Sequence, residues 1–317
     1  MPTQRRALLC GISDYPQSPL MASVKDARNL SDTLSKNEDG SPNFFCEQLL
    51  SSQTQVTKGR LRQQLIELFK HECDVALFYF AGHGYQDEFD WYMVTQDSSQ
   101  YDAGVPISNI IRLAQKSPAK EKFIILDCCN SGGAGNLTLL DDLTLLPPGT
   151  SILASSNADQ ASAEKYDAGE FTSIVIEALR GEAADIQGQV TVAGIYHFAN
   201  MLLGPWEQRP QFKANISKVT PIRRCKAKID PAILRKLPIY FETAHSPHPL
   251  SPHYDPELEP FDKEKESIFA EMRELAKLDL LVPDGTEYLY HAALHSKACK
   301  LTPLGRFYWK LAHKNQI

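Results

Sequence analysis

Residues 123–133 read FIILDCCNSGG, and residues 76–84 read ALFYFAGHG. Each stretch is a short apolar run that ends in polar and glycine residues, which is typical of a buried strand leading into a turn. In open α/β sheets, sites form at the carboxyl ends of the strands, so both tips are expected to face one crevice. The sequence therefore predicts that a pair of thiols and a histidine meet at this edge of a sheet.

Strands and helices alternate along the first 220 residues. Apolar or β-rich runs predict strands over residues 5–12, 44–50, 74–80, 91–95, 122–126, 150–156 and 211–217. Helical spacing and capping residues predict helices over residues 23–35, 58–70, 108–116, 170–180 and 192–203. This alternation indicates an α/β sandwich with a mostly parallel sheet.

The composition changes near residue 230. Seven prolines between residues 231 and 260 are typical of a linker or an extended surface segment. A charged helix over 262–279, a strand pair within 287–301 and a helix capped by Thr302 are predicted to follow. This order is similar to that of a winged-helix module. We therefore expect three parts, namely a main domain over 1–222, a basic and then proline-rich linker over 223–260, and a small winged-helix-like module over 261–317.

The overall composition is that of a soluble protein with a packed core. The 317 residues are 43% hydrophobic and 23% charged, and the formal net charge is −6. The negative charge argues against binding to nucleic acid or to an acidic membrane surface, and no apolar stretch is long enough to cross a membrane. Seven cysteines without CxxC spacing, and the lack of a signal peptide, predict reduced thiols in the cytoplasm.

The two motifs together resemble those of the caspase-like cysteine proteases. Relatives in the metacaspase and bacterial branch commonly carry (Y/F)xxGHG and then DxCxSG, and this chain has YFAGHG followed by DCCNSG. The resemblance extends to ALLCGISDY for the family's first strand, LMASVKDA for the next helix and SSNADQASAE for a later specificity loop. It implies a caspase-type α/β/α sandwich with cysteine endopeptidase activity. The animal-caspase signature QAC(R/Q/G)G does not occur.

Cys129 is the predicted nucleophile, because it stands where the family pattern DxC has its cysteine. Strand alternation indicates the same: if the strand continues through the motif, Asp127 and Cys129 point to one side and Cys128 points to the other, toward the core. A thiol is mostly protonated at neutral pH and needs a nearby base. The resemblance implies that His83 is this general base and acid, and that the backbone amides of Gly84 and Cys129 form the oxyanion hole.

Acidic residues around the motifs predict what the enzyme recognises. In metacaspase-like relatives, carboxylates hold a basic side chain just before the scissile bond, and the resemblance assigns this role to Asp127 and Asp26. Asp159, in the later loop, is a further candidate. Two carboxylates in one pocket suit a guanidinium group, so cleavage after Arg or Lys is expected. The alternatives are a solvated helix charge for Asp26 and a turn-capping carboxylate for Asp127.

Several metacaspases need calcium, which draws attention to the acidic segment after GHG. Its carboxylates are similar to a cluster of oxygen ligands and comprise Asp87, Glu88, Asp90, Asp97 and Asp102. However, the positions where we would align the family's calcium-binding aspartates read Ser98 and Asn136. A solvated acidic loop is therefore favoured over a calcium site, and no metal or other cofactor is expected.

The motifs favour a cysteine endopeptidase that acts on protein substrates, with an activating protease or a regulatory protein as a further partner. The resemblance to bacterial members suggests an effector in stress or antiviral defence. The alternative is a catalytically inactive protease-like scaffold that binds partners through its C-terminal module. The charges of that module nearly balance, which favours a protein partner over nucleic acid.

Overall fold

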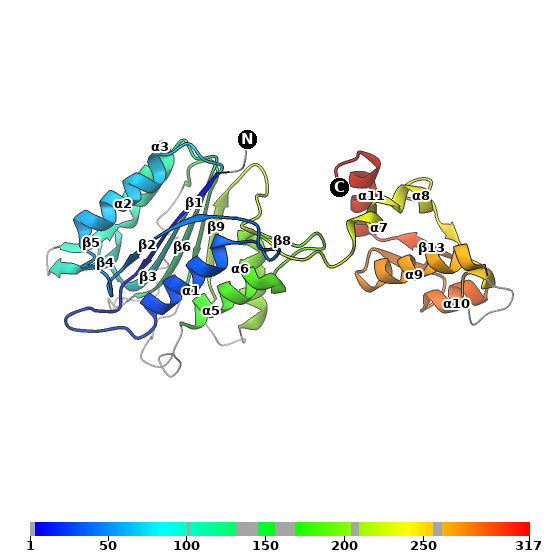
Figure 1. Cartoon of the computed structure of the whole chain (residues 1–317), viewed down its shortest axis with the longest axis horizontal. Helices are drawn as coiled ribbons and strands as arrows, with labels where there is room; N and C mark the ends of the chain where they lie inside the picture. The colour runs from blue at the N-terminus through cyan, green and yellow to red at the C-terminus, as the bar shows by residue number, and fades with distance from the viewer. Residues whose placement is uncertain (1–3, 100–101, 131–144, 156–168, 204–208, 256–261) are drawn as a thin grey trace. The chain divides into compact units, whose positions relative to one another are not determined.

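The computed structural model divides the chain into two compact units, residues 1–226 and 227–317 (Figure 1). The residues described are 4–99, 102–130, 145–155, 169–203, 209–255 and 262–317, and for 129 and 130 the description covers the backbone alone. No described helix is long and apolar enough to cross a membrane.

A mostly parallel sheet forms the centre of the N-terminal unit, as the alternation of strands and helices predicts. Its strands lie in the order β2 (Phe45–Leu50), β1 (Arg5–Gly11), β3 (Val75–Gln86), β6 (Glu121–Asn130), β7 (Thr150–Ala154) and β9 (Gln211–Asn215). The first five are parallel, and β9 runs antiparallel to β7. An antiparallel hairpin, β4 (Trp91–Ser99) and β5 (Asp102–Pro106), joins the sheet through the end of β3.

Helices cover both faces of this sheet (Figure 1). One face carries α2 (Lys58–Lys70) and α3 (Ile107–Lys116), and the other carries α1 (Ser23–Ser35), α5 (Glu170–Glu177) and α6 (Val192–Leu202). Side chains of β3 alternate between the two cores: Phe78 and Phe80 lie with α2 and α3, whereas Leu77 and Tyr79 lie with the other helices. Because both faces are buried, the central strands read as continuous apolar runs.

Local signals set several helix ends. The side chains of Thr57 and Thr191 accept hydrogen bonds from amides in the first turns of α2 and α6, as a helix cap does. The helix that begins at Glu170 passes into a π-helical turn over Ala178–Glu182. Gly181 ends it with a φ of 129°, a conformation that favours glycine. A short ribbon of β8 (Gln189–Val190) and β10 (Arg223–Arg224) completes the unit.

The two motif strands continue further than the sequence predicts. Instead of turning at its glycines, β3 runs on to Gln86, and β6 runs on to Asn130, where the described part of the second motif ends. The strands pair in register up to Gly84 and Asn130, and the end of β3 also pairs with β4. Ladders on both edges hold this glycine-rich segment extended. The turn predicted at Gly82–Gly84 is therefore wrong, because these residues lie within the sheet. The turn predicted at Gly132 and Gly133 lies outside the described residues.

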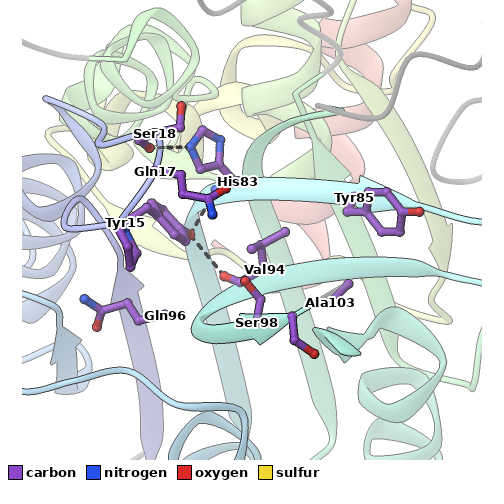
Figure 2. A pocket seen from close by; sticks show the side chains of 11 residues that line it. Tyr15, Gln17, Ser18, His83, Tyr85, Val94, Gln96, Ser98 and Ala103 are labelled. Carbon is purple, nitrogen blue, oxygen red and sulfur yellow. Dashed lines mark hydrogen bonds between the residues drawn. The ribbon is translucent and has the colours of Figure 1, made fainter. Parts of the chain in front are cut away.

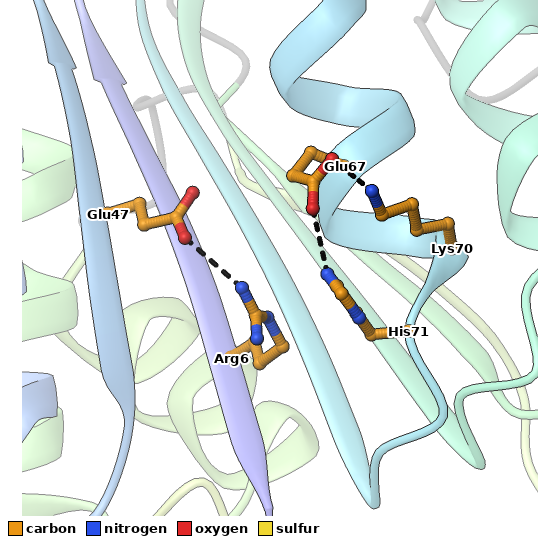
Figure 3. A network of polar contacts seen from close by, with 5 residues as sticks. All are labelled: Arg6, Glu47, Glu67, Lys70 and His71. Carbon is orange, nitrogen blue, oxygen red and sulfur yellow. Dashed lines mark hydrogen bonds and ion pairs between the residues drawn. The ribbon is translucent and has the colours of Figure 1, made fainter.

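An ion pair between strands and a polar cluster near the end of α2 lie on the surface of this unit (Figure 3). Arg6 of β1 lies 3.1 Å from Glu47 of β2, and Glu67 lies 2.5 Å from Lys70 and 2.9 Å from His71. Exposed pairs of this kind contribute about 0–1 kcal/mol each. The two apolar cores, rather than these pairs, therefore hold the motif strands in place.

The C-terminal unit is a small antiparallel sheet with helices. Its strands lie in the order β11 (His248–Pro249), β13 (Ala298–Leu301) and β12 (Leu281–Asp284). Its helices are α7 (Pro231–Arg235), α8 (Leu237–Tyr240), η2 (Pro252–Tyr254), α9 (Lys263–Lys277), α10 (Leu289–Leu294) and α11 (Pro303–His313). Thr302 caps α11 as predicted. The winged-helix type expected for this unit stays a prediction.

Two expectations for this part of the chain differ from the structure. Much of the predicted linker over 223–260 is folded into the C-terminal unit, where β11 pairs with β13 and Phe241 and Leu250 are buried. Apolar side chains between the prolines are buried in this unit, and the number of prolines alone does not indicate this burial. Within 287–301, where a strand pair is predicted, residues Leu289–Leu294 form a helix because their buried side chains follow helical spacing.

Candidate active site

The two motifs lie on neighbouring strands. β3 and β6 are parallel, and their register pairs Ala81 with Asp127 and His83 with Cys129. Residues paired across a sheet are about 4.8 Å apart in the hydrogen-bonding direction, so the backbone places Cys129 beside His83. The positions that the motifs predict for a thiol and its base are therefore adjacent in the fold.

Tyr15 holds this part of β3 from the loop that follows β1. Its hydroxyl accepts a hydrogen bond from the His83 amide and donates one to the Val94 carbonyl of β4, each at 3.0 Å (Figure 2). The Tyr15 and His83 rings lie 4.6 Å apart between centroids. This role was not predicted from the sequence. Tyr15 ends the segment ALLCGISDY, but nothing in that segment indicates that its hydroxyl bonds to two strands.

Gly82 leaves room for that hydroxyl. A Cβ on Gly82 would lie 2.5 Å from the Tyr15 oxygen, well inside nonbonded contact distance. Any side chain here would push the tyrosine away from the His83 amide. The close approach of a neighbouring group, rather than a turn, is what requires glycine before the histidine.

A second contact orients the imidazole of His83. Its Nε2 atom lies 2.7 Å from the carbonyl oxygen of Ser18 (Figure 2). A carbonyl oxygen only accepts hydrogen bonds, so Nε2 carries the proton of the neutral ring and Nδ1 has the lone pair. This tautomer makes Nδ1 the nitrogen that can take a proton from a neighbouring group.

Cys128 points into the core on the face covered by α2 and α3. Its side chain is buried there with Phe80 and Leu126, and its amide donates to the Ser155 hydroxyl at 3.2 Å. This is the packing role that strand alternation predicts for the first cysteine of the motif. Cys129 is the next residue of β6, and its side chain lies outside the described part of the structure.

Asp26 and Asp127 come from separate elements and lie together on the other face. Their Oδ2 atoms lie 2.9 Å and 3.1 Å from the point that a Cβ on Gly169 would occupy. The Gly169 amide, at the start of α5, donates to Asp26 at 3.0 Å. Thr172 of α5 donates to Asp127 and shares a hydrogen bond of 2.6 Å with the Tyr79 hydroxyl. The first turn of α5 thus anchors both carboxylates, a role for Gly169 and Thr172 that no sequence motif marks.

Burial changes the acidity of this pair. Burial is the main cause that raises the pKa of Asp26 to about 7, and the charge of Asp127 also raises it. The hydrogen bond from the Gly169 amide acts in the opposite direction. Burial also raises the pKa of Asp127, against its hydrogen bonds with Thr172. A cation between the two carboxylates would favour the ionised form of both.

The surroundings of the two acids argue against the alternative roles considered for them, a solvated helix charge and a turn cap. Asp26 is only 2% exposed, so it is not a solvated charge on the surface of α1. Asp127 lies within β6 and accepts a hydrogen bond from a helix side chain, so it does not cap a turn. Of the other predicted residues, Gly84 pairs with Met93 of β4 and with Asn130 of β6. Asp159 lies outside the described residues.

Several of the acidic residues after GHG make hydrogen bonds or ion pairs within the protein. Asp87 accepts hydrogen bonds from two amides of its own turn, and Asp97 accepts one from the Lys58 amide at the start of α2. Asp102 lies 2.6 Å from the Lys58 ammonium group. Within the described ranges, no group of three or more His, Cys, Asp or Glu side chains is arranged to hold a metal ion.

A cavity of about 640 Å³ lies beside His83 (Figure 2). Its walls come from the loop after β1, the end of β3 and the β4–β5 hairpin. Gly84 pairs with Asn130 on one edge of β3 and with Met93 on the other. The β4–β5 hairpin and the backbone of Cys129 therefore lie on opposite edges of β3, with His83 between them.

Comparison with known proteins assigns this arrangement to a family. A family model described as the caspase domain matches residues 4–220, which include both motif strands. No curated protein matches the chain. Among solved structures, a structural-genomics crystal structure of a protein from Geobacter sulfurreducens aligns with a TM-score of 0.47 and 13% sequence identity, covering 70% of this chain and 97% of that one. On the evidence of the family match, this chain belongs to the caspase-domain family.

Proposed function

We propose that the chain is a cysteine endopeptidase that cleaves proteins after Arg or Lys, with Cys129 as the nucleophile and His83 as the general base and acid. The observation that carries the proposal is the register of β3 and β6, which pairs these two residues. Membership of the caspase-domain family supports a cysteine peptidase as the general class.

The proposed reaction has two steps. In the first, Nδ1 of His83 takes the thiol proton, and the Cys129 thiolate attacks the carbonyl carbon while the amides of Gly84 and Cys129 stabilise the oxyanion. The C–N bond then breaks as Nδ1 returns the proton to the leaving nitrogen, which departs as an amine and leaves a thioester. In the second step, His83 takes a proton from water, whose oxygen attacks the thioester. The carboxylic acid leaves, and the proton returns to the thiol.

The acid pair supports specificity for a basic residue before the scissile bond. Asp127 precedes Cys129 by two residues in β6, and Asp26 shares its position beside Gly169. A guanidinium or ammonium group between the buried Asp26 and the half-buried Asp127 makes charge-assisted hydrogen bonds and offsets the repulsion of the two carboxylates. We include Asp159 as a further member of this pocket.

A panel of fluorogenic peptides that end in Arg, Lys or Asp tests the proposal, with Cys129→Ala as the control. Arginyl and lysyl peptides should be cleaved by the unaltered chain alone, and aspartyl peptides at least about 100-fold more slowly. Truncating one partner of a buried charge pair costs about 2–5 kcal/mol. Asp127→Asn should therefore slow cleavage of arginyl peptides by at least about 30-fold. Equal activity on aspartyl peptides would contradict the specificity.

The same panel separates the enzyme from an inactive protease-like scaffold. A scaffold would cleave none of the peptides in a Cys129-dependent manner, although the chain is folded. The wider role that we propose, a bacterial effector in stress or antiviral defence, rests on the family resemblance. Survival of bacteria challenged with phage, compared between the unaltered chain and Cys129→Ala, tests it.

A further inference from the structure

Neither Asp26 nor Asp127 lines the cavity beside His83. Asp127 and Cys129 belong to β6, on one edge of β3, whereas the cavity is bounded by the hairpin on the other edge. Among the described side chains, His83 is the one member of the proposed chemistry that lines the cavity. Its ring is held at this border by Tyr15 and by the Ser18 carbonyl, both of which also line the cavity (Figure 2).

This position matters because His83 must deliver a proton to the leaving nitrogen. The peptide that departs continues from that nitrogen, so its first residues extend from the histidine and not from the thiol. The basic residue on the other side of the scissile bond goes to the acid pair, which includes Asp127 of β6. The space left for the departing peptide is the side of β3 where the cavity lies.

We propose that this cavity binds the first side chains after the scissile bond and selects uncharged, apolar or aromatic ones; this inference rests on the function proposed above. The rings of Tyr15, Pro16 and Tyr85 supply apolar wall, and Gln17 and Gln96 supply neutral polar groups. None of the described lining residues has a carboxylate, ammonium or guanidinium group. A charged side chain would lose solvation here without gaining a partner.

The size of the cavity agrees with this role. Pockets that bind small ligands measure roughly 300–1,000 Å³, and about 640 Å³ accommodates one or two amino-acid side chains. The cavity would therefore read the first one or two positions of the departing peptide. It would add to the selection for Arg or Lys that the acid pair makes on the other side of the scissile bond.

Internally quenched peptides test the preference directly. All carry Arg before the scissile bond, and the residue after it is Leu, Tyr, Lys or Asp in otherwise identical sequences. The full-length chain should cleave the Leu and Tyr peptides about tenfold faster, in kcat/KM, than the Lys and Asp peptides. Equal rates for charged and uncharged residues at this position would overturn the inference.

Opposite charges placed in the wall give a sharper test. Ser98 of β4 is exposed and lines the cavity, so Ser98→Asp should raise the Lys-to-Asp ratio of kcat/KM and Ser98→Lys should lower it. Each shift should be about two- to fivefold, the range of a partly exposed ion pair. The same two substitutions at Ser217, exposed after β9 near the opposite end of the sheet, should leave the ratio unchanged. Unchanged ratios in the Ser98 variants would contradict the inference.

Two measurements keep the failure of this inference distinct from failure of the proposed function. A peptidyl-arginyl chloromethyl ketone carries no departing peptide, so Ser98→Asp and Ser98→Lys should be labelled at the rate of the unaltered chain. If the unaltered chain is not labelled in a Cys129-dependent manner, that result would count against the proposed function itself. Normal labelling with no change in the Lys-to-Asp ratio would count against the cavity alone. If Ser98 variants do not fold, the same substitutions at Ala103 of β5 repeat the test from the facing strand.

Discussion

Cys128 and Cys129 are neighbours in β6 but face different partners across the sheet. Cys128 is paired with Gly82 and packs in the core, whereas Cys129 is paired with His83. Cys129→Ala should therefore abolish cleavage of arginyl peptides, and Cys128→Ala should keep kcat/KM within about threefold. Loss of a buried sulfur should cost Cys128→Ala on the order of 1 kcal/mol of unfolding free energy.

Peptide cleavage and urea unfolding measured on both variants check this assignment. A folded Cys128→Ala variant that has lost cleavage, beside a Cys129→Ala variant that retains it, would reverse the roles of the two thiols.

Asp26 makes stability depend on pH. Its pKa rises to about 7 in the folded chain, so the folded state binds more protons than the unfolded state between about pH 4 and pH 7. The contribution of the protonated carboxyl is complete below that range and is lost as the pH rises through it. Asp26→Asn keeps an acceptor for the Gly169 amide but does not titrate. Its unfolding free energy, relative to that of the unaltered chain, should therefore be about 1–3 kcal/mol higher at pH 8 than at pH 5.

Urea unfolding at both pH values measures this gain, and Asp32→Asn is the matched control on the exposed side of the same helix. A gain that is the same at pH 5 and pH 8 would mean that Asp26 does not titrate in this range.

At the scale of elements, the loop after β1 acts as a brace between β3 and β4. The Tyr15 hydroxyl bonds to the backbone of both strands, at His83 and at Val94. Tyr15→Phe removes both hydrogen bonds and leaves a partly buried amide without its partner, at about 1–3 kcal/mol. The variant should fold with a lower melting temperature, and its kcat/KM should fall about tenfold because the imidazole is less well positioned.

Tyr85→Phe is the matched control, since Tyr85 lines the same cavity with an exposed ring. Steady-state kinetics and thermal unfolding of the two variants decide the matter. Equal effects of both substitutions would show that Tyr15 is not a specific brace.

The elements also show how far sequence patterns predict this fold. Apolar runs correctly predict the central strands, because strands buried on both faces leave a clear signal. The continuation of β3 through Gly82 and Gly84 is hidden, since glycine is read locally as a turn and the ladder that keeps it extended comes from β4 and β6. The helix Leu289–Leu294 is short and flanked by β-forming residues, so tertiary burial decides it.

Part of the candidate site can likewise be predicted from the sequence, and part of it cannot. The pairing of His83 with Cys129 follows from two motifs whose strands become neighbours. The supports for the acid pair, Gly169 and Thr172, lie more than forty residues along the chain in an ordinary helix start, and no local pattern connects them to Asp127. Contacts of this kind arise only once the whole sheet has formed.

At the scale of the whole molecule, the distribution of basic residues limits where the enzyme can process itself. No Lys or Arg occurs from Phe123 through Glu164, and the next basic residue is Lys165. An enzyme that cuts after basic residues cannot cut its own chain between the nucleophile strand and that lysine. We therefore expect the catalytic unit to work as one continuous chain across 123–164.

The junction between the two units is where a cut by this specificity is expected. Arg223 and Arg224 lie in β10, and the Arg223 guanidinium donates to the Leu179 carbonyl, so cleavage there requires the ribbon to open. Lys226 and Lys228 are exposed, outside any helix or strand, and flank the division between residues 226 and 227. Exposed chain without regular structure is the preferred site of nicking. Cleavage after one of these lysines would divide the chain at the junction between the two units.

Intact-mass analysis of the purified chain, incubated beside Cys129→Ala, should detect this cut in the unaltered protein alone. Lys226→Gln combined with Lys228→Gln should leave the chain whole at the junction while peptide cleavage continues, because these residues lie outside the site. A secondary cut at Lys165 would still agree with basic specificity. A Cys129-dependent cut within 123–164, for instance after Asp141 or Asp142, would contradict both the continuous chain and the basic specificity, because no lysine or arginine is there to be recognised.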